Sequence, residues 1–296
     1  MKPLSIAYVH FDSDRYNHSG NGKQTGMFSY EVPELEWAHY PVGRHFQLDL
    51  TGIARRHDVV FQDDHKCYGS FVNAQAIPVL YYVVDSTLSE EHHQMRRQVA
   101  GRNADLILVD HDRLERFAHL GKPVRRLSYC VNERFYAGTG EPRMTDVCYH
   151  CRSTGHAQRQ KLEQWLAEFC KRRGYRCTVG KREPVLYAQS FNTSKIAVSL
   201  ARTPVNRPHR VFDVMAAGAC LVTSRLPSVS SEERTAGVHY VEFSDFDGLG
   251  RAVDRLLESG DWEQIAEAGH TLVMERHTWA VRARELREMV ADVFGI

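Results

Sequence analysis

The sequence lacks the features that mark membrane-spanning, secreted and nucleic-acid-binding proteins. No apolar run approaches the roughly 18 residues that a membrane span requires, and the first residues form no signal-peptide pattern. The formal net charge is only +1, so the basic excess of a protein that binds nucleic acid electrostatically is missing. The 296 residues, 43% of them hydrophobic, predict a globular protein with room for two domains.

Cysteine does not occur in the patterns that predict disulfides or zinc. The 7 cysteines are scattered and odd in number, which is typical of a reducing compartment, so we expect a cytoplasmic protein. Cys148 and Cys151 form a C-x-x-C pair, but Cys170 and Cys177 lack the spacing of a second zinc-binding pair. We therefore expect buried thiols and no metal.

Two other motifs are incomplete. Gly22-Lys23 lacks the earlier glycine and the following Ser or Thr of a phosphate-binding loop, which argues against a kinase or an ATPase. Asp63-Asp64-His65 is similar to the carboxylates of metal-dependent transferases, but their single-domain fold would leave the second half of the chain unexplained. The glycine-containing segment His10–Gly26 indicates a long loop over the site where a substrate would bind.

Apolar runs recur along the first half of the chain, and each ends in polar residues. Such runs are typical of strands buried on both faces of a parallel sheet. Because ligands bind beyond the carboxyl ends of parallel strands, we expect these polar residues to share one edge. The predicted strands are Ile6–Val9, Val59–Phe61, Val79–Val84, Leu106–Val109 and Val124–Tyr129.

The second half repeats the alternation of strand and helix after the glycine- and proline-containing linker Ala137–Pro142. We predict an α/β protein with two Rossmann-like parallel-sheet domains facing across a cleft, residues 1–140 and 141–278, followed by a helix in 279–296. The predicted strands are Val147–Tyr149, Tyr175–Val179, Ile196–Leu200, Cys220–Thr223 and Tyr240–Phe243. The predicted helices are Leu162–Phe169, Val211–Ala217, Leu249–Leu257 and Trp279–Val293.

The segment Tyr187–Thr223 is the most informative. It runs from a strand through a loop rich in Pro and Arg into a short helix. Arg207, His209 and Arg210 are expected at the start of this helix, where free N–H groups and guanidinium groups favour phosphate. Asp213, in the first turn, is expected to accept hydrogen bonds from ribose hydroxyls.

Each of these residues also has a simpler interpretation. Arg210 and Asp213, three residues apart, would form an ion pair on a solvated helix face. Gly218 would be a helix C-cap and no more.

The segment resembles the C-terminal domain of group 1 glycosyltransferases, most closely the CgeB-type (spore maturation protein) branch. The resemblance covers roughly residues 147–290, and more loosely the strands around 78–85, 104–110 and 127–132. The matching residues are Tyr187, Asn192–Ile196, Arg210–Asp213, Ala216–Gly218, Ala268-Gly269 and His277-Thr278.

The resemblance implies the GT-B architecture, with the donor held mainly by the second domain and the last helix, in 279–296, packed back on the first. It implies a nucleotide-sugar donor, for which we expect a UDP-sugar, and no divalent metal, since basic side chains neutralise the leaving diphosphate. The residues expected to bind this donor are Arg159, Tyr187, Lys195, Arg210, Asp213 and Gly218. Among them Arg210, assisted by Lys195 and Arg159, is expected to stabilise the leaving group.

Two positions depart from the family pattern. The first of its two acidic residues falls near Val205-Asn206, where this chain has no acid, so the donor hydroxyl that is held and the stereochemical outcome stay open. Many retaining members carry a histidine where this chain has Val84, so that catalytic role cannot be transferred.

The catalytic base is expected at a strand end of the first domain. Asp85 follows the longest apolar strand and is the first candidate, and Asp12 and His111 are the next, with His65. Such residues after a strand also serve as helix caps or turn formers.

The resulting hypothesis is a cytoplasmic glycosyltransferase that moves a hexosyl or pentosyl group from a UDP-sugar to a hydroxyl of a saccharide, protein, metabolite or modified DNA base. The alternatives are a GT-B-fold epimerase or phosphorylase, and a non-catalytic nucleotide-sugar-binding protein.

Overall fold

The computed structural model describes residues 2–11, 27–64, 67–83, 90–110, 114–136, 142–151, 155–182, 184–201, 209–226 and 234–296. Their contacts divide the chain into two compact units, Met1–Cys130 with Trp279–Ile296, and Val131–Thr278. The predicted linker, residues 137–142, lies in the second unit, and 137–141 are outside the described residues.

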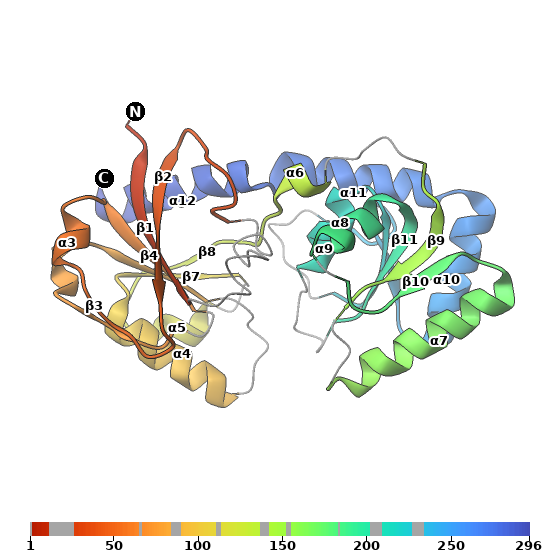
Figure 1. Ribbon diagram of the computed structural model, residues 1–296, viewed down its shortest axis with the longest axis horizontal. Helices are drawn as coiled ribbons and strands as arrows, with labels where there is room; N and C mark the ends of the chain where they lie inside the picture. Colours follow the sequence, from red (N-terminus) through yellow and green to blue (C-terminus); the bar gives the residue numbers. More distant parts are fainter. Residues whose placement is uncertain are drawn as a thin grey trace. The chain divides into compact units, whose positions relative to one another are not determined.

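The first unit is built on a parallel sheet of six strands in the order β2-β1-β4-β6-β7-β8 (Figure 1). A parallel pair, β3 and β5, lies apart from it. The strands are β1 (Leu4–Phe11), β2 (Leu35–Val42), β3 (Gln47–Asp49), β4 (Val59–Asp63), β5 (Ser70–Val72), β6 (Val79–Val83), β7 (Leu106–Val109) and β8 (Val124–Arg126). The helices are α3 (Thr51–Ala54), η1 (Ala74–Ala76), α4 (Glu90–Asn103), α5 (Glu115–Ala118) and α12 (Trp279–Phe294).

All five strands predicted for this half form, and the sheet is parallel as predicted. Strand β2 was not predicted, because polar residues interrupt its apolar pattern and Pro41 lies within it. It is the edge strand next to β1, a position that tolerates proline since one side of the strand needs no ladder hydrogen bonds.

Helices cover both faces of this sheet, which is why its strands are apolar on both sides. On one face, Val99 and Ala100 of α4 pack with Tyr81 and Val83 of β6. On the other, Phe28 contacts the rings of Tyr8, Phe61 and Trp279, the last being the first residue of α12. The indole nitrogen of Trp279 also donates to the carbonyl of Tyr30 over 2.9 Å, so α12 is fixed to the first unit.

The second unit holds a parallel sheet of five strands in the order β10-β9-β11-β12-β13. Its strands are β9 (Thr145–Tyr149), β10 (Cys177–Val179), β11 (Ser194–Ser199), β12 (Cys220–Ser224) and β13 (Val241–Phe243). Its helices are α6 (Glu133–Tyr136), α7 (Ala157–Arg173), α8 (Pro184–Asn192), α9 (Arg210–Ala216), α10 (Phe246–Ser259) and α11 (Trp262–Arg276). The strands predicted for this half form; α8 and α11 were not predicted.

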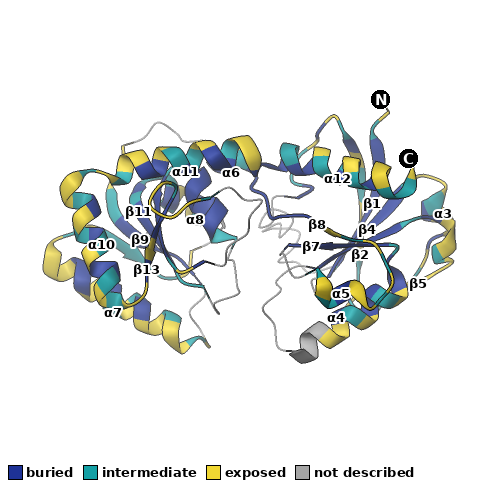
Figure 2. Ribbon diagram, turned by 180° about the vertical axis from the view of Figure 1, so that it is seen from behind, coloured by how far each residue is buried: buried dark blue, intermediate teal, exposed yellow. Residues whose placement is uncertain are grey.

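Side chains that alternate along β9 show which helices cover each face of the second sheet. Val147 and Tyr149 pack with apolar residues of α7 and α10. His150 points to the opposite face, because successive side chains of a strand alternate, and its ring contacts Phe191 of α8. Figure 2 shows the central strands β9 and β11 largely buried, with the exposed residues of α7 and α10 on their outer surfaces. The carboxyl ends of β9 and β11 therefore emerge between two helical layers.

Candidate functional site

Arg210 is the first residue of α9, the helix that follows β11 on the carboxyl side of the second sheet. Its side chain is half-buried, and its Nε and Nη1 atoms are buried without a hydrogen-bond partner in the part of the chain that the structure describes. Burial lowers the pKa of this guanidinium, but Tyr187, Cys151 and Asp213 more than offset that effect and leave the pKa above its ordinary value. Arg210 therefore stays charged and has N–H groups that a bound acceptor could satisfy.

Asp213 lies in the first turn of α9 and is only 7% exposed. Its Oδ2 atom accepts a hydrogen bond from the hydroxyl of Tyr187 at 3.1 Å. Burial raises the pKa of Asp213 to about 7, although hydrogen bonds with Tyr136 and Tyr187 and the charge of Arg210 oppose the rise. The predicted residues Tyr187, Arg210 and Asp213 are thus brought together, and Tyr136 joins them without a signal in the sequence.

Arg159, predicted to bind the donor, belongs to the first turn of α7. Its charge, like that of Arg210, lowers the pKa of Tyr149, the last residue of β9. Burial and the nearby Cys151 thiol outweigh both arginines, so the pKa of Tyr149 is raised and its hydroxyl stays protonated. Two of the predicted cationic residues therefore flank one tyrosine at the carboxyl end of β9.

His150, which sequence reasoning did not single out, follows Tyr149 at the same edge. It is fully buried; Nδ1 donates to the carbonyl of Gly180 at 3.0 Å, and Nε2 lies 3.3 Å from the hydroxyl of Thr178. Burial lowers its pKa to about 4, and the charges of Arg182 and Arg210 act in the same direction. The imidazole is therefore neutral and orders the backbone beyond β10.

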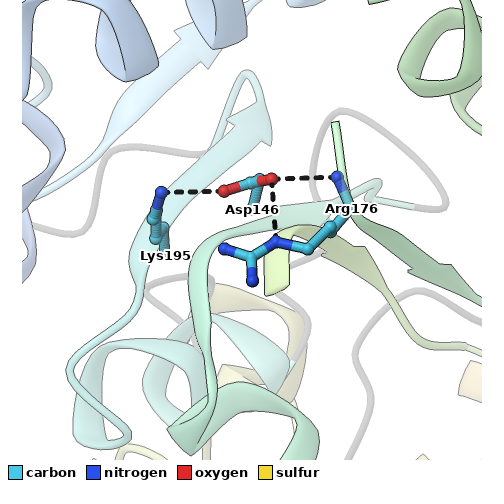
Figure 3. A network of polar contacts seen from close by, with 3 residues as sticks. All are labelled: Asp146, Arg176 and Lys195. Carbon is cyan, nitrogen blue, oxygen red and sulfur yellow. Dashed lines mark hydrogen bonds and ion pairs between the residues drawn. The ribbon is translucent and has the colours of Figure 1, made fainter. Parts of the chain in front are cut away.

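Lys195, predicted to assist Arg210, lies at the other end of β11. It is the second residue of this strand, whereas Arg210 follows the strand's carboxyl end. Figure 3 shows its ammonium group directed at Asp146, with an Nζ–Oδ1 distance of 2.8 Å, while the same carboxylate binds the backbone and side chain of Arg176. The structure does not bring Lys195 to Arg210; the signal that suggested it was only its place within the motif.

Gly218 also lies away from the carboxyl edge, just beyond the last turn of α9. Its φ angle is +66°, and a Cβ atom there would come within 2.8 Å of Nη2 of Arg143. That nitrogen donates to the carbonyl of Ala217 at 2.9 Å, and Nη1 of Arg143 donates to the carbonyl of Phe191 at 3.1 Å. The contacts of Gly218 are those of a helix terminus packed against a half-buried arginine, which is the simpler interpretation considered above.

The predicted catalytic residues of the first unit, Asp12, Asp85 and His111, lie outside the described residues, as does His65. Among the described residues at the carboxyl ends of the strands, Asp63 accepts a hydrogen bond from the hydroxyl of Tyr8 at 3.2 Å. Asp64 forms a buried ion pair with Nε of Arg96 at 2.7 Å. These contacts engage both carboxylates of the Asp63-Asp64 motif within the protein.

None of the described residues forms a group of three or more His, Cys, Asp or Glu side chains suited to a metal ion. All seven cysteines are described, and none of them is in a disulfide. Among the described helices, none combines the length and apolar character needed to cross a membrane.

The chain is similar to known proteins in part of its sequence and in its fold. Residues 149–288 match a family model described as glycosyl transferase-like, and no curated protein matches the sequence. The glycosyltransferase from Rickettsia africae is similar in structure, with a TM-score of 0.62 at 8% identity over 99% of each chain. Sucrose-phosphate synthase from Thermosynechococcus elongatus has a TM-score of 0.57 at 11% identity over 99% of each chain.

HepE from Anabaena is similar in two liganded structures. In complex with UDP and glucose it has a TM-score of 0.60 at 11% identity, and in complex with UDP-glucose a TM-score of 0.61 at 12% identity. Both comparisons cover 98% of this chain and 100% of HepE. The CgeB-type branch stays a prediction. At these identities the similarity shows the fold: the chain has the two Rossmann-like domains of GT-B, and its second unit and the start of α12 carry the glycosyl transferase-like match.

Proposed function

We propose that this chain is a glycosyltransferase whose second unit binds a UDP-sugar at the carboxyl edge of its sheet and that the sugar is transferred to a hydroxyl acceptor. One observation carries the proposal. The guanidinium of Arg210 is charged and has two buried nitrogens without partners among the described residues, beside the carboxylate of Asp213. A cation with unsatisfied donors next to a carboxylate fits a nucleoside diphosphate, since phosphate and ribose hydroxyls need these two partners.

Arg210 and Asp213 bind different parts of the donor. Arg210 binds the diphosphate and neutralises the negative charge that develops on it when the bond to the sugar breaks. Asp213 accepts hydrogen bonds from the ribose, because Tyr187 engages Oδ2 and a carboxylate has four acceptor positions. Arg159 adds a second positive charge at the same edge, so we propose transfer without a divalent metal.

The complexes of HepE with UDP and glucose and with UDP-glucose support UDP as the nucleotide. We propose a hexosyl or pentosyl group as the sugar that is transferred. We propose Asp85, with Asp12 and His111 as the other candidates, as the base that takes the proton of the acceptor hydroxyl.

Calorimetry with UDP, GDP, ADP and TDP and their sugars tests the proposal directly. We expect one nucleotide diphosphate to bind the wild type and Arg210→Ala to lose at least tenfold in affinity, because a charged hydrogen bond to phosphate contributes about 1.5–3 kcal/mol. The matched control is Arg172→Ala, an exposed arginine near the end of α7, which changes the net charge equally and should bind as the wild type does. Failure of the wild type to bind any nucleotide would refute the proposed function.

Turnover separates the transferase from its alternatives. Release of UDP that depends on an added acceptor supports transfer, whereas interconversion of two UDP-sugars without an acceptor would indicate an epimerase. Tight binding without either reaction would indicate the non-catalytic binding protein, which the absence of an acid at Val205-Asn206 keeps as the second candidate.

A further inference from the structure

Two hydroxyl groups are buried without a hydrogen-bond partner at the carboxyl edge of the second sheet. They are the OH of Tyr149 and the Oγ of Ser199, both 0% exposed, and neither has a nitrogen or oxygen partner in the described part of the chain. Tyr149 ends β9 and Ser199 ends β11, the neighbouring strand. The unpaired nitrogens of Arg210 belong to the first residue after the loop that leaves β11. This edge thus combines several buried polar groups that the protein itself does not satisfy.

The hydroxyl of Tyr81, in β6 of the first sheet, is also buried without a partner among the described residues, whereas several other tyrosines have one. Tyr8, Tyr175 and Tyr187 each donate a hydrogen bond to a carboxylate, at 3.2, 2.9 and 3.1 Å respectively. The thiol of Cys151 is in hydrogen-bond contact with the Tyr149 hydroxyl, but sulfur is a weak hydrogen-bonding group and does not replace an oxygen. A buried hydroxyl without a full partner carries the cost of its lost hydration. The ring of Tyr149 packs in the apolar layer formed with α7 and α10. This packing involves the ring and does not require the hydroxyl.

The surroundings of Tyr149 identify the missing partner. Arg159 and Arg210 both act electrostatically on this hydroxyl. The hydroxyl is protonated and can donate, and the two guanidinium groups can only donate. What satisfies the tyrosine hydroxyl and the two nitrogens of Arg210 is an anion with several acceptor oxygens, and the charge of Arg159 favours the same anion.

We propose that the hydroxyl of Tyr149 donates a hydrogen bond to a phosphoryl oxygen of the bound nucleoside diphosphate, beside Arg210. The inference rests on the proposed function and adds a ligand-binding residue to it. The arginines supply charge, and the tyrosine supplies a neutral donor whose rigid position at the strand end fixes where the phosphoryl oxygen lies. In the free protein this donor has only the weak contact with the Cys151 thiol, so a full hydrogen bond is gained only when the ligand binds.

Tyr149→Phe tests the inference because it removes only the oxygen. We expect its affinity for UDP to fall about tenfold, the equivalent of one hydrogen bond to a charged group, and its affinity for uridine, which has no phosphate, to stay unchanged. The thermal midpoint of the free variant should equal or exceed that of the wild type, because an unpaired buried hydroxyl is lost. Tyr175→Phe is the matched control: it should lower the midpoint, since that hydroxyl binds Asp254, and leave UDP binding unchanged.

The outcomes separate this inference from the proposed function. If the wild type binds UDP, Arg210→Ala does not, and Tyr149→Phe binds as tightly as the wild type, the inference is wrong and the proposed function stands. If Tyr149→Phe loses stability and affinity for UDP and uridine alike, the hydroxyl has a structural role and the inference is also wrong. If the wild type binds no nucleotide, both fail together.

Discussion

The hydroxyl of Tyr187 on α8 donates a hydrogen bond to Oδ2 of Asp213 on α9 across 3.1 Å. The carboxylate has little contact with solvent, and Tyr136 of α6 bonds to it as well. Burial nevertheless outweighs these hydrogen bonds and raises the pKa of Asp213 to about 7. The residue proposed to hold the ribose therefore destabilises the free protein when it is ionised.

Stability should reflect this in its pH dependence. The folded pKa of Asp213 lies above the value of about 3.9 expected in the unfolded chain, so the folded state binds the proton more tightly and the free energy of unfolding falls as the pH rises from about 4 to about 7. Asp213→Asn removes this titration. We expect the variant to gain about 3 kcal/mol relative to the wild type between pH 5 and pH 8, measured by urea unfolding at each pH.

Tyr187→Phe provides a second check on the same group. Because the lost hydroxyl stabilises the carboxylate, the pKa of Asp213 should rise further and the fall in stability should extend to higher pH. A difference between Asp213→Asn and wild type that does not change with pH would contradict the assignment.

Much of the fold follows from local pattern, whereas the site does so only in part. Strand Leu106–Val109 was predicted with the bounds observed, because four buried apolar residues between polar ones leave few alternatives. Strand β2 was missed since an edge strand does not need a continuous apolar run. Helix α11 was missed because its pattern is interrupted by His270 and by Gly269, which packs against the carbonyl of His239.

Sequence spacing likewise predicts some residues of the site and misses others. Arg210 and Asp213 lie three residues apart on one helix, so sequence spacing alone brings them together. Tyr136 and Tyr149 reach them from distant parts of the chain, and no local pattern distinguishes them from core tyrosines. Lys195 is the opposite case. It lies inside the motif, but it is near the start of β11 and bonds to Asp146, so it is at the edge of the sheet opposite to Arg210.

Lys195 should accordingly affect stability and not nucleotide binding. Its ammonium group pairs with Asp146, whose pKa is lowered because hydrogen bonds with Lys195 and Arg176 outweigh the opposing effect of burial. Lys195→Met should cost about 1 kcal/mol, the range of a partly exposed ion pair, and this loss should shrink as the pH falls and Asp146 is protonated in wild type and variant alike. Titration calorimetry should give an unchanged UDP affinity; a loss comparable to that of Arg210→Ala would instead place the lysine in the donor site.

Gly218 gives a prediction in which backbone strain and close packing can be separated. Gly218→Ala should destabilise the protein through its positive φ, which costs about 1 kcal/mol in an L-residue, and also because its Cβ would displace Nη2 of Arg143 from 2.8 Å. Losing the bonds of that half-buried guanidinium adds about 1–3 kcal/mol. Gly260, which ends α10 with φ +81° and would have nothing within 4 Å of an added methyl group, is the matched control. We therefore expect unfolding measurements to give a larger loss for Gly218→Ala than for Gly260→Ala. Equal losses would mean that Arg143 moves aside freely, and a loss of UDP affinity in Gly218→Ala alone would show that the glycine also serves the site.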